Sequence, residues 1–125
     1  MSRDWYQDIQ DLVRLFDQYE GKRPHNPPDD VINFRMCLIR EEIQETLDAM
    51  LEHDLPKVAD GIVDSIVVLL GAAVAYGMDV RPIWNEVFKA NMLKVSGPIR
   101  EDGKRLKPSG WKPPDIKKIL SEQGG

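Results

Sequence analysis

Residues 61–77 read GIVDSIVVLLGAAVAYG, the most apolar stretch of the chain. Asp64 is its only charged residue, and the uncharged remainder is shorter than the ~20 residues that a membrane-spanning helix needs. A continuous apolar run that ends at a glycine is typical of a helix in a protein core. The stretch therefore predicts a core helix from about Asp54 to Tyr76, and it predicts no membrane partner.

Three further helices are predicted around this core helix. Apolar residues recur at helical spacing over about 4–19, and further helical segments cover about 29–53 and 79–95. Aspartates just before a helix, and prolines in its first turn, are typical of helix starts. The residues expected in these roles are Asp29 or Asp30, Asp54 with Pro56, and Asp79 with Pro82.

Residues 96–125 differ from the helical segments because they are polar, basic and rich in turns. Only a short helix, over about 114–120, is expected there. No alternating apolar pattern is long enough for a sheet. The sequence therefore predicts an all-α fold, with a four-helix bundle-like catalytic core over 1–95 and a basic tail over 96–125.

Composition limits the classes of function. The 125 residues carry a net charge of -4, so we expect one domain that does not bind nucleic acid, which requires a basic surface. The single Cys37 excludes an internal disulfide framework and favours a reducing cytoplasm. Its neighbours Met36 and Leu38 predict a buried thiol. The first residues show no signal-peptide pattern, which also favours the cytoplasm.

Acidic residues fall on the apolar face of the second predicted helix. Successive residues of a helix turn by about 100°, so Glu42 points in nearly the same direction as Leu38 and Thr46. Glu45 lies at the edge of this face, and Glu41 lies just beyond it. Burial of a carboxylate is costly unless the charge is paired or binds a metal ion.

The core helix repeats this pattern. Aliphatic residues surround Asp64, and Asp60 lies one turn earlier on the same face. Two neighbouring helices that each offer an acidic pair indicate a shared cation. Because every candidate ligand is an oxygen, and His25 and His53 are expected on the surface, we expect Mg²⁺, with Mn²⁺ as the alternative. The lack of a histidine ligand also argues against a di-iron bundle.

A second interpretation assigns the same acids to ion pairs. Glu41 and Glu42 would then pair with nearby cations, and Asp64 with an arginine across the bundle. The cations considered for the two glutamates are Arg35, Arg40 and Lys57. Because buried acids tend to mark functional sites, we favour the metal for Glu42, Glu45 and Asp64. For Glu41 alone, both interpretations remain open.

These segments resemble the all-α nucleoside triphosphate pyrophosphohydrolases, the superfamily of MazG, the dimeric dUTPases and phosphoribosyl-ATP pyrophosphohydrolase. EEIQE at 41–45 resembles the E-E-x-x-E motif, ADGIVDS at 59–65 resembles the second acidic helix, and NMLKV at 91–95 resembles the Asn-x-x-Lys segment. The tail at 110–114, GWKPP, is similar to a subgroup close to the phosphoribosyl-ATP enzymes. The resemblance covers about 31–94.

The resemblance implies that Glu42, Glu45 and Asp64 bind the metal ions. The family's second motif is Glu-x-x-Asp, and Gly61 stands where its glutamate belongs. Asp60 is the candidate replacement, because it lies a full turn before Asp64 on the same face. An alternative alignment makes Asp60 the motif aspartate and puts a lysine at the glutamate position.

The reaction that the resemblance implies is hydrolysis between the α and β phosphates, which releases a monophosphate and pyrophosphate. Either Glu41 or Glu42 would remove a proton from the attacking water, and we assign this role to Glu41, because it flanks the ligands without being needed as one. Asn91 and Lys94 lie three residues apart and are predicted to contact substrate. A polar helix end explains these two residues equally well.

The basic tail offers further contacts to a nucleotide. Its residues of interest are Arg100, Lys104, Arg105, Lys107, Trp111 and Lys112. Because cations bind phosphate and an indole stacks on a base, Arg105, Lys107 and Trp111 are the predicted binding residues. A solvated arm that docks on a second subunit is the alternative.

The remaining apolar residues of the fourth helix, Trp84, Val87 and Phe88, predict a homodimer, with a tetramer as the alternative. Three functions agree with the pattern. The favoured one is house-cleaning hydrolysis of canonical or damaged nucleoside triphosphates. The second is hydrolysis of phosphoribosyl-ATP in histidine synthesis. The third is a non-catalytic helical dimerisation or regulatory module, for which the missing motif glutamate at Gly61 is the argument.

Overall fold

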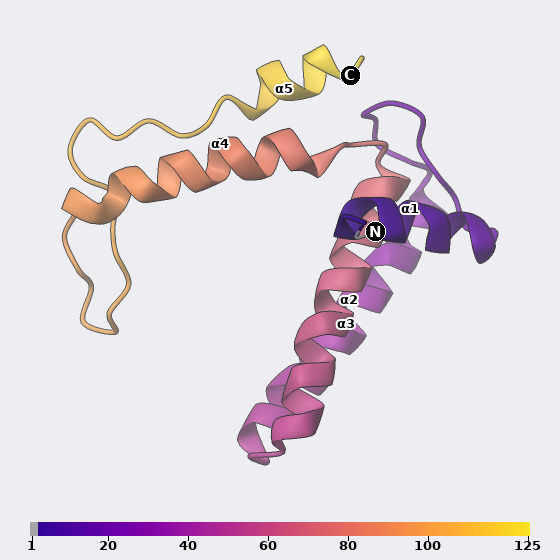
Figure 1. Ribbon diagram of the computed structural model, residues 1–125, viewed down its shortest axis with the longest axis horizontal. Helices are drawn as coiled ribbons and strands as arrows, with labels where there is room; N and C mark the ends of the chain where they lie inside the picture. The colour runs from indigo at the N-terminus through magenta and orange to yellow at the C-terminus, as the bar shows by residue number, and fades with distance from the viewer. Residues whose placement is uncertain (1–2) are drawn as a thin grey trace.

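The computed structural model describes residues 3–125, and all the regular elements within them are helical (Figure 1). The elements are α1 (Trp5–Leu15), α2 (Asp29–Leu51), α3 (Leu55–Ala75), α4 (Val80–Met92), the 3₁₀ helix η1 (Leu93–Ser96) and α5 (Ile116–Glu122). An isolated bridge between Ile99 and Arg105 is the only strand-like pairing of the described part. The predicted all-α class is therefore confirmed.

The hydrophobic core lies where α1 packs across the C-terminal half of α3. Its buried members are Tyr6, Ile9, Val13, Ala73 and Val74. The α1 residues recur every three to four positions, so they share one helix face. Small residues on α3 let α1 approach closely. This contact holds one end of α3, while α2 packs along both halves of α3, beside Gly71 and beside Gly61.

α1 ends earlier than the sequence predicted. Its last residue is Leu15, whereas a helix over 4–19 was expected. Asp17 adopts a left-handed conformation (φ 54°), and the Gln18 N–H donates to the Val13 carbonyl at 3.0 Å. The prediction was wrong because an aspartate takes the left-handed position at which a glycine usually ends a helix.

α2 starts at the predicted position, but not with the predicted cap. Pro28 is the capping residue, without a side-chain hydrogen bond, and Asp29 and Asp30 lie inside the first turn. The expectation that one of these aspartates caps the helix is therefore wrong. Their charges instead face the positive end of the helix dipole.

A tight turn joins α2 to α3 and makes the two helices a long hairpin (Figure 1). His53 in this turn is left-handed (φ 57°), so α2 stops at Leu51, two residues before the predicted end. Asp54 caps α3 through a hydrogen bond from the Lys57 N–H, as predicted. Gly77, also left-handed, follows the last turn of α3, which confirms the predicted end.

Two glycines allow α2 and α3 to pack closely. A Cβ atom at Gly61 would collide with the Thr46 side chain and lie 3.1 Å from the Thr46 Cα. A Cβ atom at Gly71 would lie 2.5 Å from Nη1 of Arg35. The two helices therefore approach each other closely at two levels along the hairpin. The contact of Gly61 with Thr46 is neutral, and the contact of Gly71 is with the buried guanidinium of Arg35.

α3 is the most apolar helix, with a mean hydropathy of 2.0 over its best window, and its length and composition alone would allow it to cross a membrane. Within the described chain it packs instead on α1 and α2, as a core helix is expected to do. Its packing is incomplete, because Ile62, Val63 and Leu69 are between 45% and 59% exposed. Much apolar surface of α3 therefore has no cover within one chain.

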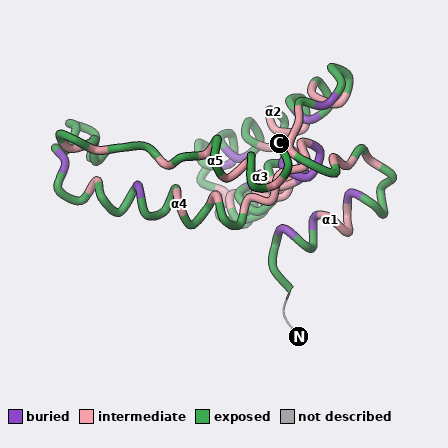
Figure 2. The backbone as a smooth tube through the Cα atoms, turned by 90° about the horizontal axis from the view of Figure 1, so that it is seen from above, coloured by how far each residue is buried: buried purple, intermediate pink, exposed green. Residues whose placement is uncertain are grey.

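α4 runs away from the α2–α3 hairpin, and the tail doubles back along it (Figure 1). Asp79 caps α4 and Pro82 lies in its first turn, as predicted, while η1 forms the predicted end near Lys94. Ala90 is the only buried residue of α4, and Figure 2 shows most of this helix exposed. We conclude that α4 is an arm with little support from the core.

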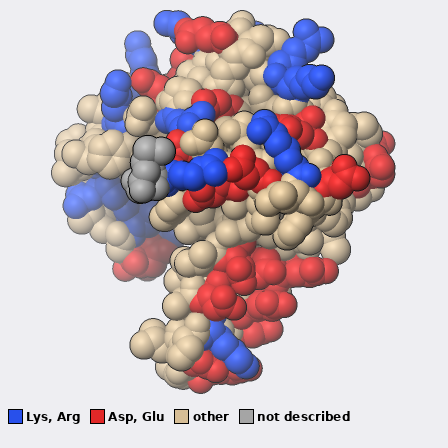
Figure 3. All heavy atoms as spheres, turned by 45° about the vertical axis from the view of Figure 1, so that its right-hand side comes forward, with Lys and Arg blue, Asp and Glu red and all other residues tan. Residues whose placement is uncertain are grey.

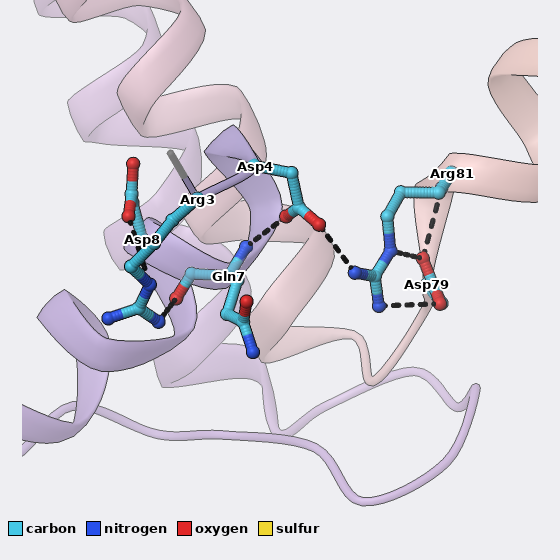
Figure 4. Close-up of polar contacts among 6 residues, drawn as sticks. All are labelled: Arg3, Asp4, Gln7, Asp8, Asp79 and Arg81. Atoms are coloured by element: carbon cyan, nitrogen blue, oxygen red, sulfur yellow. Dashed lines mark hydrogen bonds and ion pairs between the residues drawn. The ribbon is translucent and has the colours of Figure 1, made fainter. Parts of the chain in front are cut away.

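The start of α4 is held by polar contacts at both sides. Arg81 donates to Asp79 at 2.9 Å and to Asp4, the cap of α1, at 2.8 Å (Figure 4). The Gln123 side chain, just after α5, accepts from the Asp79 N–H at 2.9 Å and donates to the Asp79 carbonyl at 2.8 Å. Arg81 therefore connects the start of α4 to α1, and Asp79 connects it to the end of α5.

Candidate metal and nucleotide site

Glu42 lies at the middle of the α2–α3 hairpin, where the sequence placed it. It is half-buried, and its Oε2 atom is buried with no hydrogen-bond partner. Burial raises the pKa of the Glu42 carboxyl above its ordinary value, and four neighbouring acids raise it further. In order of effect, these acids are Glu45, Asp64, Asp60 and Glu41. The other four acids that the sequence singled out therefore lie close enough to Glu42 to affect its charge.

These acids lie on an open face of the hairpin. Asp64 is half-buried, whereas Glu45 and Asp60 are exposed. A cleft of about 320 Å³ opens beside Glu45 and Asp60, toward the turn that joins the two helices, and Glu42 and Asp64 do not line it; its lining residues are Glu45, Asp48, Ala49, Glu52, Lys57, Asp60 and Gly61. Figure 3 shows acidic side chains gathered over the part of the molecule that projects downward, which is this hairpin.

The ion pairs that would explain these acids without a metal are not formed. Arg35 donates to Gln18, and Lys57 approaches only Asp54, at 3.9 Å. Within residues 3–125, no lysine, arginine or histidine forms an ion pair with Glu42 or Asp64. The alternative interpretation from the sequence is therefore wrong for these two acids in this structure.

The donor set of this acidic cluster fits a hard divalent cation. Its atoms are carboxylate oxygens, and the orphaned Oε2 of Glu42 lacks a positive partner. In the described part of the chain, no three acidic, histidine or cysteine side chains converge closely enough to hold an ion. Glu45 and Asp60 are exposed and free to rotate, so their side chains would have to turn toward Glu42 to complete a site. The ligand set stays a prediction.

Position 61 explains the departure from the family motif. Gly61 is buried against Thr46, whose hydroxyl lies 3.3 Å from the Ser65 hydroxyl. A glutamate at this position would strike α2. Asp60 lies next to it and lines the same cleft, so it remains the candidate for the acid that position 61 has no room for. The Thr46–Ser65 contact could not be predicted from helical periodicity, because these residues lie on different helices.

Glu41 lies outside the buried face, as expected for the proposed base. Its side chain is exposed and accepts a hydrogen bond from the Cys37 thiol at 3.3 Å. Cys37 is itself exposed, so the expectation of a buried thiol is wrong. The apolar neighbours that suggested burial point in other directions around α2. The hydrogen bond to Glu41 raises the pKa of the Cys37 thiol above its ordinary value.

The predicted nucleotide-binding residues form a second group at the far end of α4. The Trp111 indole N–H donates to the Ala90 carbonyl at 2.7 Å. The Nζ atoms of Lys94 and Lys107 lie 5.1 and 4.9 Å from the centre of the indole ring. Neither lysine forms an ion pair in the part of the chain that is described. Two unpaired cations on one aromatic ring suit a phosphate ester.

The other two predicted residues lie nearby with different contacts. Arg105 donates to the Gly97 carbonyl at 3.2 Å, so one of its N–H groups is already used. Asn91 is exposed on the last turn of α4. The arm carries this group away from the acidic cluster on the hairpin (Figure 1). Within residues 3–125, the acidic cluster and the residues around Trp111 therefore lie apart, as two separate groups of predicted site residues.

Residues 9–91 match the protein family described as phosphoribosyl-ATP pyrophosphohydrolase. The match includes every member of the acidic cluster and ends at Asn91, before Lys94 and the tail residues. No curated protein matches the chain.

Proposed function

This chain belongs to the phosphoribosyl-ATP pyrophosphohydrolase family, within the MazG-like all-α superfamily, and we propose that it is a magnesium-dependent nucleotide pyrophosphohydrolase. Pyrophosphohydrolase activity is the activity of the family. The observation that supports the proposal most strongly is Glu42, a half-buried acid with an orphaned oxygen and four acidic neighbours. Such a concentration of negative charge is unfavourable unless a cation binds there.

Each acid of the cluster has a proposed role. Glu42, Glu45, Asp60 and Asp64 hold Mg²⁺, with Mn²⁺ as the alternative ion. The chemistry that a bound ion supplies is neutralisation of charge on the phosphates and on the leaving pyrophosphate. Glu41 removes a proton from a water molecule. The oxygen of this water forms a bond to the α phosphorus as the bond to the bridging α–β oxygen breaks.

The residues around Trp111 are proposed to bind the substrate that occupies the acidic cluster of a neighbouring subunit. Lys94 and Lys107 would hold phosphate, Trp111 would stack on the base, and Asn91 and Arg105 would add hydrogen bonds. Within one chain these residues lie at the end of the α4 arm (Figure 1). A homodimer that places the arm of one chain against the hairpin of the other would complete the pocket, and a tetramer is the alternative.

Uncovered apolar surface supports this assembly. Trp84 is 71% exposed and Phe88 is 54% exposed on α4, and α3 leaves Ile62, Val63 and Leu69 open. Large exposed apolar surface of this kind is typical of protein interfaces. We therefore propose that α3 and α4 face a second copy of the chain, in the cytoplasm, without nucleic-acid or membrane partners.

The favoured substrate class is a canonical or damaged nucleoside triphosphate, removed as a house-cleaning reaction. The family description favours phosphoribosyl-ATP as the second candidate. The third candidate, a non-catalytic module, loses its main argument, because the steric contact at Gly61 accounts for the missing glutamate and Asp60 provides an acid beside it.

The test is pyrophosphate release from a panel of nucleoside triphosphates and phosphoribosyl-ATP, with and without Mg²⁺. We expect Mg²⁺-dependent release of pyrophosphate and a monophosphate, and the preferred substrate chooses between the first two candidates. Lys107→Gln is expected to raise KM more than it lowers kcat, because it removes a phosphate contact and leaves the acids intact. Absence of pyrophosphate release with all substrates would overturn the proposal and favour the non-catalytic module.

A further inference from the structure

Arg35 lies on α2 two turns before Glu42 and points into the same helix interface. Only 4% of its surface is exposed. Its Nη2 atom donates to the Gln18 Oε1 atom at 2.9 Å, and its Nε atom is buried with no hydrogen-bond partner. The guanidinium carbon lies 5.3 Å from the centre of the Phe34 ring. All its identified contacts are therefore with uncharged groups.

The positive charge of Arg35 has no counter-ion. In residues 3–125, no carboxylate forms an ion pair with it. Burial lowers the pKa of its guanidinium, and no acidic neighbour opposes that effect. Arginine nevertheless stays protonated in proteins. A buried charge without a partner is strongly unfavourable, so a missing anion is the simplest explanation.

The packing of α3 makes room for this cation. Nη1 of Arg35 lies where a side chain at Gly71 would begin, 2.5 Å from the position of a Cβ atom. Gln18, from the loop after α1, holds the opposite side of the guanidinium. The side chain is thus positioned by two other segments, and its free donors are preorganised.

A small pocket opens beside the guanidinium. Its volume is about 180 Å³, and its lining residues are Gln18, Tyr19, Asp30, Val31, Phe34 and Arg35. This volume is well above what one water molecule needs, so the pocket has room for one small oxyanion beside the guanidinium. Asp30 is the only acid of the lining, and it makes no ion pair with Arg35.

We propose that this pocket, the Arg35 pocket, binds one small oxyanion of phosphate or carboxylate chemistry. The Arg35 fork would donate to two oxygens, which is the geometry that arginine forms with both kinds of anion. The Gln18 amide, already in contact with Arg35, adds a further donor. The pocket is separate from the acidic cluster, about 10 Å farther along α2. The proposal does not depend on the proposed catalytic function.

The test is calorimetric titration of the full chain with inorganic phosphate and, separately, with acetate. EDTA keeps the acidic cluster free of metal, and chloride keeps the ionic strength constant. We expect one site per chain, at least about tenfold weaker in Arg35→Gln, because a charge-assisted hydrogen bond is lost. Arg40→Gln removes an exposed cation one and a half turns away and is expected to change nothing. The tighter of the two anions identifies the chemistry.

Two further variants keep the test decisive if Arg35→Gln does not fold. Val31→Glu places a carboxylate one turn before Arg35, so we expect anion binding to be lost and the melting temperature without anion to rise. Asp30→Asn removes a like charge from the pocket and is expected to tighten binding. The proposal is overturned if neither anion binds the wild type, or if Val31→Glu or Arg35→Gln binds the anion as tightly as the wild type does.

Discussion

Arg35 and Glu42 lie seven residues apart on one face of α2, and both direct a charge into the interface with α3. Their surroundings are opposite. Glu42 is surrounded by four acids that raise its pKa, whereas Arg35 contacts an amide, an aromatic ring and a glycine. Neither has a partner of opposite charge in the described chain. Within residues 3–125, one helix interface therefore carries an unpaired acid at one level, the Glu42 level, and an unpaired cation at the next, the Arg35 level.

The largest expected effect is on catalytic activity, which should depend on Glu42 and not on Arg35. Glu42→Gln removes the central ligand of the acidic cluster, and we expect kcat/KM for pyrophosphate release to fall at least about a hundredfold, because a metal ion contributes several kcal/mol to such reactions. Arg35→Gln, provided that it folds, is expected to retain activity within about threefold. A steady-state assay at saturating Mg²⁺ measures both. Equal losses in the two variants would contradict a division between the levels.

The next effect concerns the two glycines that let the helices meet. Gly61→Ala pushes a methyl group against the side chain and backbone of Thr46, and we expect a loss of about 1–3 kcal/mol in the free energy of unfolding. Gly71→Ala meets only the far end of the Arg35 side chain, which can move, so we expect a smaller loss. Urea unfolding of both variants provides the measurement. A larger loss at position 71 would show that the Arg35 level is the tighter contact.

The smallest effect is on the pH dependence of stability without metal. The raised pKa of Glu42 means that the folded chain holds this proton more tightly than the unfolded chain does. The stabilisation is therefore present below the unfolded pKa, roughly 4.3, and is lost as the pH rises through the raised pKa. Melting temperatures in EDTA across this range should decline less in Glu42→Gln than in the wild type. Arg35→Gln should follow the wild type, because arginine does not titrate there.

The sequence predicts the partly buried position of Glu42 because the signal for it is local. Helical geometry places Glu42 among apolar residues of its own helix, and Asp64 shows the same anomaly on α3. Capping by Asp54 and Asp79 and the stop at Gly77 are also local, and all three are confirmed. The early end of α1 was missed because Asp17, a residue with only a modest left-handed preference, takes that conformation.

The surroundings of Arg35 could not be predicted, because the residues that form them are distant in the sequence. The sequence alone predicts for Arg35 only a possible ion pair with the glutamates. Its actual partner, Gln18, lies 17 residues away in a loop, and its space comes from Gly71 on another helix. For the same reason, the sequence predicts that Lys94, Lys107 and Trp111 all bind substrate, but it does not predict that the two lysines lie over the indole ring. Contacts between elements depend on packing, which periodicity within one element does not contain.

The central claim, that the acidic cluster binds Mg²⁺, is tested most directly by calorimetric titration of Mg²⁺ into the metal-free chain. We expect saturable binding in the wild type that is lost in Glu42→Gln. Binding should be retained in the control Glu86→Gln, because Glu86 lies on α4 and pairs with Lys89 outside the acidic cluster. Mn²⁺ in place of Mg²⁺ is expected to give the same pattern. Wild-type binding that is absent, or that survives unchanged in Glu42→Gln, would contradict the account.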